Sequence, residues 1–243
     1  MVHQLDGDAG VVAARPALSG ESVLAGAAPW PETVADAIAL QSRLRDHIER
    51  ADRFAPPVTV AGIDAAYGRR GGPAHAAAVL FDLAALTPLE QAEATVATAF
   101  PYVPGLLSFR EGPAAVAAIG SLSRRPDVLM CDGQGIAHPR RIGIASHLGL
   151  VLDLPAIGVA KSRLVGKHGE PGPNRGDWTP LVDGGDVIGA VVRTREKVRP
   201  VFVSIGHRVS LETAIALVLA CTRRFRLPEP IRAADRLSRC IGA

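Results

Sequence analysis

The amino-acid sequence predicts an α/β protein with a mixed β-sheet flanked by helices. With 243 residues and 48% hydrophobic content, the chain can bury a large core. Short apolar runs first follow one another through short connections, as in an antiparallel meander, and then alternate with helical patterns, as parallel strands require. We expect one domain over residues 30–243 and a poorly ordered extension over 1–29, which is rich in Ala, Gly and Ser and lacks periodicity.

The first expected elements are an amphipathic helix and three antiparallel strands. From Pro31 to Arg53 apolar residues recur near helical spacing, with acidic residues early and basic residues late, as the helix dipole favours. Three apolar or alternating runs then follow at 58–63, 76–81 and 92–100, separated by turn-forming residues. These runs predict an antiparallel meander.

The second half of the chain alternates between helical and strand patterns before it ends in a hairpin and two helices. A flexible surface loop is expected over 166–176. The predicted elements are helix 113–125, strand 128–131, helix 141–152, strand 156–160, a hairpin of strands 187–192 and 201–204, helix 211–225 and a short helix from Pro230.

Composition narrows the class of protein without identifying it. The net charge of +3 and the pI near 9.0 indicate a mild basic bias, and the local arginine clusters fit either phosphate binding or an ordinary solvated face. Three cysteines without a Cys-x-x-Cys pair argue against a disulfide framework. No signal peptide or membrane-spanning run is recognisable, so we expect a cytoplasmic protein that does not bind membranes.

Three acidic residues stand where predicted elements begin or end. Asp64 follows the first strand run, Asp132 follows the run 128–131 and precedes a glycine turn, and Glu111 precedes an alanine-rich helical stretch. Hard cations such as Mg²⁺ prefer such oxygen ligands together with substrate phosphate. Each acid alone fits a solvent-facing loop position, but together they predict a metal site, provided that the two strands are neighbours.

Other polar and aromatic residues allow two interpretations. Lys161, at the end of a strand run, either stabilises charge on phosphate or is an ordinary surface lysine. Tyr102 lies between two prolines, where it is either a stiff wedge for a base stack or a packed turn residue. His207 either contacts phosphate or makes a structural hydrogen bond, and spacing alone makes Asp235 a surface residue.

The glycine turn before His138 does not predict a dinucleotide site. Gly133 and Gly135 supply two glycines of that fingerprint, but position 138, where the third belongs, is histidine. We therefore exclude a nicotinamide-binding interpretation.

Six motifs occur in one order along the chain. They are Ala61-Gly62-Ile63-Asp64, Pro101-Tyr102-Val103-Pro104-Gly105, Phe109-Arg110-Glu111-Gly112-Pro113, Asp132-Gly133 through His138-Pro139-Arg140-Arg141, Ile157-Gly158-Val159-Ala160-Lys161-Ser162, and Arg226-Leu227-Pro228-Glu229-Pro230. With these motifs the chain resembles the endonuclease V family, the deoxyinosine-directed repair nucleases, from about Gln41 to Arg239.

The resemblance implies a ribonuclease H-like fold and a Mg²⁺-dependent DNA repair endonuclease. Such an enzyme hydrolyses the second phosphodiester bond 3′ to deoxyinosine and leaves 3′-hydroxyl and 5′-phosphate ends. The implied partner is DNA containing deoxyinosine, with no obligate protein partner. The alternatives are a non-catalytic nucleic-acid-binding module of the same fold, an endonuclease acting on inosine in RNA, and a small-molecule phosphatase, which would need no wedge.

The resemblance also implies roles for individual residues. Asp64, Glu111 and Asp132 are implied as catalytic metal ligands, and Tyr102 as the wedge that separates the strands. It raises Asp235 from a surface residue to a member of the site. It also makes Lys161 a catalytic candidate and His138 a candidate DNA contact. Gly133, Gly135 and His207 complete the candidate DNA contacts.

Overall fold

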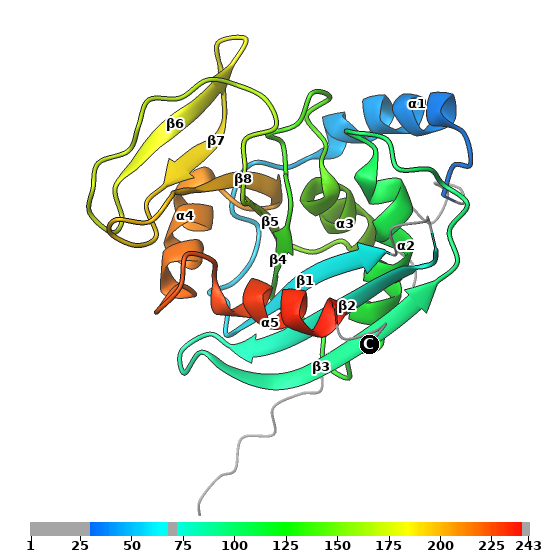
Figure 1. The fold of residues 1–243 in the computed structure, drawn as a ribbon, viewed down its shortest axis with the longest axis horizontal. Helices are drawn as coiled ribbons and strands as arrows, with labels where there is room; N and C mark the ends of the chain where they lie inside the picture. Colours follow the sequence, from blue (N-terminus) through cyan, green and yellow to red (C-terminus); the bar gives the residue numbers. More distant parts are fainter. Residues whose placement is uncertain (1–29, 68–71, 240–243) are drawn as a thin grey trace, which may run out of the picture.

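The computed structural model describes residues 30–67 and 72–239, which form a mixed sheet with helices against both faces (Figure 1). The expected extension over 1–29 lies outside the described residues. Within them, the sheet has eight strands in the order β3-β2-β1-β4-β5-β8-β7-β6. The strands are β1 (Thr59–Tyr67), β2 (Ala74–Asp82), β3 (Thr87–Val96), β4 (Val128–Asp132), β5 (Ala156–Ala160), β6 (Trp178–Asp183), β7 (Asp186–Val192) and β8 (Val201–His207).

The strand directions confirm the predicted mixed sheet. β1, β2 and β3 form an antiparallel meander. β4 and β5 then add in parallel to β1, because a helix connects each to the strand before it. β8, β7 and β6 continue the sheet with antiparallel pairing. The neighbouring positions of β1 and β4 are the arrangement that the predicted metal site required.

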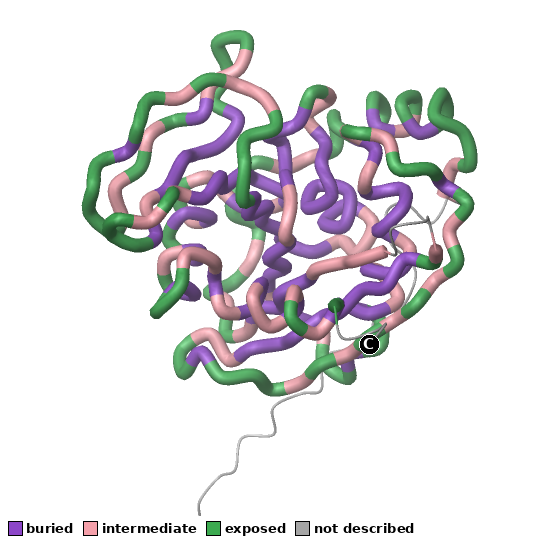
Figure 2. The backbone as a smooth tube through the Cα atoms, viewed as in Figure 1, coloured by how far each residue is buried: buried purple, intermediate pink, exposed green. Residues whose placement is uncertain are grey.

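The helices cover the two faces of the sheet in separate layers. They are α1 (Val34–Leu44), followed by a 3-10 turn (Arg45–His47), α2 (Leu107–Gly120), α3 (Ile144–Leu152), α4 (Leu211–Ala220) and α5 (Glu229–Ser238). Side chains alternate between the faces along each strand. Val128 and Met130 of β4 therefore pack in the core with α4 and α5, while Leu129 and Cys131 pack with α2 and α3. Figure 2 shows that burial is concentrated in the central strands.

Several predicted boundaries were wrong. The first helix ends at Leu44, not Arg53, and α4 ends at Ala220 rather than 225. β3 covers Thr87–Val96 instead of 92–100, because its pairing with β2 begins directly after the turn between the two strands. The segment 166–176 is mostly irregular, as predicted, with one isolated bridge between Lys167 and Val182.

One strand and one helix start were missed. β6 escaped prediction because Pro180 interrupts it, and proline is tolerated there since β6 is an edge strand. Proline commonly occupies the first turn of a helix, so Pro113 suggested a helix start, yet α2 begins six residues earlier at Leu107. The earlier start lets Phe109 pack in a buried aromatic cluster.

The described part of the chain contains no helix that is both long and apolar enough to cross a membrane. The cytoplasmic location expected from the sequence stays a prediction.

Candidate active site

Asp64 and Asp132 come together because β1 and β4 are parallel neighbours. Their pairing ends with Ile63 opposite Cys131, so the two aspartates are the next residues on adjacent strands. Asp132 is the last residue of β4, but Asp64 lies inside β1, contrary to its predicted place at a strand end. β1 runs on because β2 pairs with it along its whole length.

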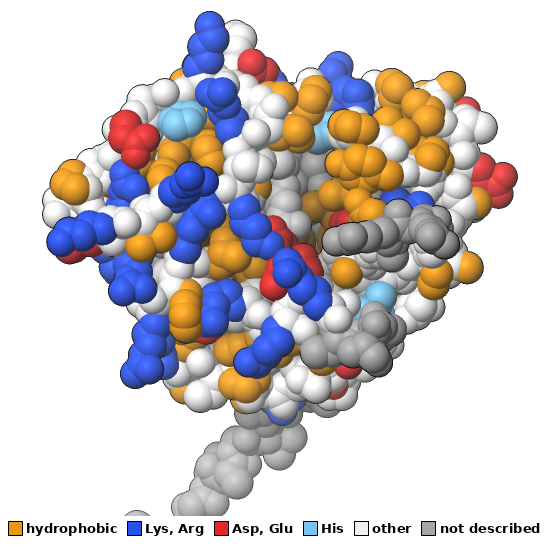
Figure 3. All heavy atoms as spheres, in the orientation of Figure 1, with side chains coloured by type: hydrophobic (Ala, Val, Ile, Leu, Met, Phe, Trp, Pro, Cys, Tyr) orange, Lys and Arg blue, Asp and Glu red, His pale blue; other side chains and the backbone are white. Residues whose placement is uncertain are grey.

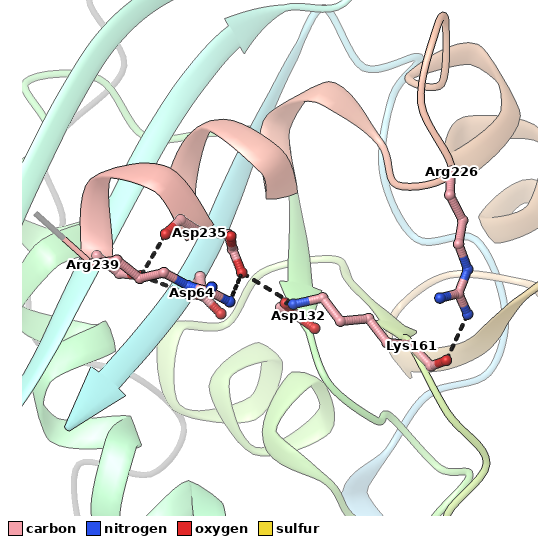
Figure 4. Close-up of polar contacts among 7 residues, drawn as sticks. Asp64, Asp132, Lys161, Arg226, Asp235 and Arg239 are labelled. Atoms are coloured by element: carbon pink, nitrogen blue, oxygen red, sulfur yellow. Dashed lines mark hydrogen bonds and ion pairs between the residues drawn. The ribbon is translucent and has the colours of Figure 1, made fainter. Parts of the chain in front are cut away.

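Helix α5 brings a third carboxylate to the same point. Carboxylate oxygens of Asp64, Asp132 and Asp235 all lie within 4.8 Å of one another (Figure 4). The helix approaches β1 closely at Gly62, where a Cβ atom would lie only 2.1 Å from the carbonyl oxygen of Pro230. A glycine in this strand is therefore a condition for placing Asp235 beside the other two acids.

Lys161 supplies positive charge to this cluster, which we call the acidic cluster (Asp64, Asp132 and Asp235). Its Nζ atom lies 2.5 Å from Oδ2 of Asp132 and 3.0 Å from Oδ1 of Asp235. Burial alone would lower the pKa of Lys161, but its bonds to Asp132 and Asp235 raise it, so the ammonium stays charged. Arg239 also contacts Asp235, at 2.7 Å.

Two acids of the site, Asp64 and Glu111, have raised pKa values. Burial raises the pKa of Asp64 to about 6; the hydrogen bond from Ser238 opposes the shift, and the charges of Asp132 and Asp235 add to it. Burial, followed by the charges of Asp64 and Asp132, raises the pKa of Glu111 to about 8. Both shifts come first from burial and then from neighbouring negative charge, and a bound cation would oppose them.

Glu111 reaches the site from the opposite layer of the fold. It is the fifth residue of α2 and not a residue before a helix, as the sequence suggested, and only 6% of its surface is exposed. Its side chain is close enough to feel the charges of Asp64 and Asp132, but it does not belong to the three-carboxylate group within 4.8 Å. Its role as a metal ligand stays a prediction.

Tyr102 stands on an exposed loop that a buried arginine holds. Its side chain is 59% exposed, and its ring centroid lies 6.1 Å from that of Tyr67 at the end of β1. The guanidinium of Arg110 lies 4.7 Å above the Tyr67 ring and donates to the carbonyl of Phe100 at 2.6 Å. This exposed aromatic on an anchored backbone has the form that a wedge needs.

His138 makes a hydrogen bond to the backbone of the segment that follows Tyr102. Its Nε2 atom lies 2.9 Å from the carbonyl oxygen of Gly105, which also accepts hydrogen bonds from Gln41 and Arg140. Since the carbonyl can only accept, Nε2 carries the proton. Burial, reinforced by the charge of Arg140, lowers the pKa of His138 to about 4, so the ring is neutral. The structure thus places His138 behind the Tyr102 loop.

The two glycines of the turn after β4 allow close backbone packing. A Cβ atom at Gly135 would lie 2.0 Å from the carbonyl oxygen of Ile205, and one at Gly133 would lie 2.6 Å from the side chain of Ile144. Gly133 also has a φ of +147°, which side chains disfavour. The packing against β8 and α3 explains both glycines; their predicted contact with DNA stays a prediction.

His207 lies away from the acidic cluster. It pairs with Ala156 at the start of β5, whereas Asp132 pairs with Val159 near the other end of that strand. Its ring is buried, and its Nδ1 accepts a hydrogen bond of 3.3 Å from the backbone of Glu49. The structure therefore does not bring His207 together with the acids, and its location agrees with the structural alternative.

Two side chains with a place in the site were not singled out from the sequence. Ser238 donates a hydrogen bond of 2.6 Å to Oδ2 of Asp64. Arg226 donates to the carbonyl of Lys161 at 2.6 Å and to that of Pro200 at 2.8 Å, so it fixes the backbone that carries the lysine (Figure 4). Arg226 opens one of the six motifs, which is the signal that could have drawn attention to it.

The sheet order and the three carboxylates that meet beside its central strands define the class: a protein of the ribonuclease H-like fold with an acidic site. The endonuclease V family model matches residues 42–236. A relative named endonuclease V from Roseiflexus sp. (strain RS-1) is 56% identical over 210 residues, which cover 86% of this chain and 94% of the relative. One from Azotobacter vinelandii is 52% identical over 209 residues, covering 86% and 95%.

Solved structures agree with the sequence relatives. Endonuclease V from Streptomyces avermitilis has a TM-score of 0.83 and 46% identity, with 86% of this chain and 93% of that chain covered. Ciona intestinalis endonuclease V, solved with a 24mer DNA containing an inosine followed by a ribo-adenosine, has a TM-score of 0.74 and 30% identity, covering 86% and 97%. The chain belongs to the endonuclease V family and is a nuclease.

Proposed function

We propose that this protein is a Mg²⁺-dependent DNA repair endonuclease that recognises deoxyinosine. It hydrolyses the second phosphodiester bond 3′ to the lesion and leaves 3′-hydroxyl and 5′-phosphate ends. The observation that carries the proposal is the acidic cluster, with its three carboxylates within 4.8 Å, beside the ammonium of Lys161. Family membership supports the nuclease chemistry, and the DNA bound to the Ciona relative supports the substrate.

The donor atoms suit a magnesium ion. Mg²⁺ prefers oxygen ligands and is commonly held by one or two carboxylates together with substrate phosphate. Asp64, Asp132 and Asp235 offer only oxygen, and Glu111, on which the charges of Asp64 and Asp132 act, would add a further carboxylate from α2. When bound, Mg²⁺ would supply positive charge that stabilises the phosphate oxygens during hydrolysis.

The protein residues have separate tasks in this proposal. Lys161 keeps its proton and places positive charge between Asp132 and Asp235, beside the phosphate to be cut. Arg226 holds the lysine backbone. Tyr102 enters the base stack near the lesion, where an inosine pair opens more easily than a normal pair. Ser238 fixes the orientation of Asp64.

The test is nicking of a labelled duplex with one deoxyinosine, with and without Mg²⁺, and with the cut position mapped on a sequencing gel. Asp132→Asn keeps the side-chain shape but removes the charge, so we expect at least a hundredfold loss of nicking. Asp186→Asn, at the exposed first residue of β7, is the matched control and should nick like the wild type. Equal nicking by Asp132→Asn, or nicking in EDTA, would refute the proposal.

The same assay separates the rival functions. Binding of the duplex without any nick would indicate a non-catalytic module of this fold. A single-stranded RNA with one inosine, tested at equal concentration, measures the preference for RNA; faster cutting of RNA would replace deoxyinosine DNA as the substrate.

A further inference from the structure

A groove of about 900 Å³ opens directly beside the acidic cluster. Its walls come from the β2–β3 hairpin, the segment between α4 and α5, and α5 itself. Asp235 of the acidic cluster lines this groove together with Lys161, which contacts it at 3.0 Å, so the two sites are continuous. A substrate that reaches the carboxylates from the side of α5 and the β2–β3 hairpin therefore lies over the groove.

The groove is strongly basic. Its lining has five arginines and Lys161 against two acids, Glu229 and Asp235, and both acids are already paired. Asp235 contacts Lys161 at 3.0 Å, and Glu229 contacts an arginine of α5 at 2.6 Å. In Figure 3 the Lys and Arg side chains gather around the few acidic ones on this face. The arginines of the groove are Arg223, Arg224, Arg226, Arg232 and Arg236.

An exposed aromatic ring lies among these arginines. Phe225 is 48% exposed, although phenylalanine is normally buried, and the guanidinium of Arg232 lies 3.3 Å from its ring centroid. Cations that follow a sugar-phosphate chain together with an aromatic platform for bases are the usual features of a strand-binding groove. The apolar floor, which includes Phe81 and Leu227, can accommodate sugar rings.

We propose that this groove, between α5 and the β2–β3 hairpin, binds the segment of the nicked DNA strand that adjoins the cleaved phosphate. Arginines of the groove, Arg224 and Arg236 among them, contact its phosphates, and Phe225 stacks on a base. The inference rests on the proposed function, because the acidic cluster is where the strand is cut. It adds a binding site for the flank of the substrate, separate from the Tyr102 loop, which is carried by the segment before α2.

The experiment measures binding without catalysis. A fluorescent 30-mer duplex with one deoxyinosine is titrated in EDTA at several salt concentrations with the wild type and with the double variant Arg224→Gln/Arg236→Gln. Each phosphate contact contributes about 0.9 to the slope of log K against log salt, so the double variant should lower the slope by about 2. Both positions are exposed, so the two substitutions should leave the fold intact, and melting temperatures check this.

The matched control is Arg50→Gln/Arg124→Gln. Both arginines are exposed: Arg124 lies in the segment just before β4, and Arg50 lies beside the segment that pairs with Arg208, at the sheet end opposite Asp132. This variant should keep the wild-type slope. In nicking assays, the groove variant should raise KM at least tenfold at physiological salt and change kcat less than twofold.

Three outcomes would overturn the inference. The groove variant would retain the wild-type salt slope, or the control would lose as much slope as the groove variant. The third outcome is measured with duplexes whose nicked strand is shortened on one side of the inosine or on the other. If the binding defect of the groove variant persists with both truncations, the groove does not bind a flank of that strand. A wild type that binds but does not nick would refute the proposed function alone, since the slopes are measured without Mg²⁺.

Discussion

Glu111→Gln should stabilise the metal-free protein, and increasingly so as the pH rises. Burial raises the pKa of Glu111 from its usual value of 4.5 to about 8. The folded state therefore holds a proton that the unfolded state releases between these two pH values, and the wild type loses stability as the pH rises through this window. Glutamine has nearly the same shape and no titration, so it removes this loss.

The magnitude follows from the pKa shift. Each unit of pH between the unfolded and folded pKa values changes the free energy of unfolding by about 1.4 kcal/mol. From pH 5 to pH 8 this amounts to about 3 to 4 kcal/mol, allowing for partial titration at the upper limit. Glu111→Gln should thus be close to the wild type in stability at pH 5 and clearly more stable at pH 8.

Urea unfolding in EDTA at pH 5, 6, 7 and 8 measures the difference directly. Asp64 titrates in both proteins, so its contribution cancels to first order in the difference between their free energies of unfolding. Adding Mg²⁺ at pH 8 should reduce the advantage of the variant, because a nearby cation favours the ionised glutamate of the wild type. A stability difference that stays constant across the pH range would refute the reasoning, and Glu111 would then have an ordinary pKa.

Three further substitutions test separate parts of the site. Ser238→Ala removes the hydrogen bond that lowers the pKa of Asp64, so the variant should need more Mg²⁺ than the wild type at pH 6, with a smaller difference at pH 8. A variant whose Mg²⁺ requirement in nicking assays changes with pH as that of the wild type does would contradict this. Gly135→Ala places a methyl group 2.0 Å from the carbonyl of Ile205 and should destabilise the fold by at least about 3 kcal/mol in urea unfolding; a smaller loss would show that the turn can move. Tyr102→Ala should leave the melting temperature unchanged and slow nicking of inosine in duplex DNA more than in single-stranded DNA; equal slowing of both would argue against a wedge.

The central part of the site was predictable only in part. The sequence placed Asp64 and Asp132 at the ends of apolar runs, but it left open whether the two strands are neighbours, because two further strands and a helix lie between them. The strands are parallel neighbours in the fold, and this pairing brings the residues after it together. Lys161 was also placed correctly at the end of the next strand.

Asp235 was not predictable from spacing, because its position depends on packing between distant segments. Its helix reaches the acids through the contact between Gly62 and Pro230, which are far apart in the sequence. The motif resemblance supplied Asp235, but without a physical reason. The start of α2 was missed for a related reason: burial of Phe109 favours extending the helix in front of Pro113, where local propensity predicts a first turn.

The two layers of the fold divide the proposed reaction between them. The segment leading into α2 carries Tyr102, and α2 itself carries Glu111, whereas α5 carries Asp235 and lines the basic groove. The acidic cluster lies between these layers at the end of β4. A strand held at the lesion by one layer and along its flank by the other would present the carboxylates with a phosphate displaced from the lesion itself. This arrangement gives a structural reason for the proposed cut, which lies beside inosine instead of at it.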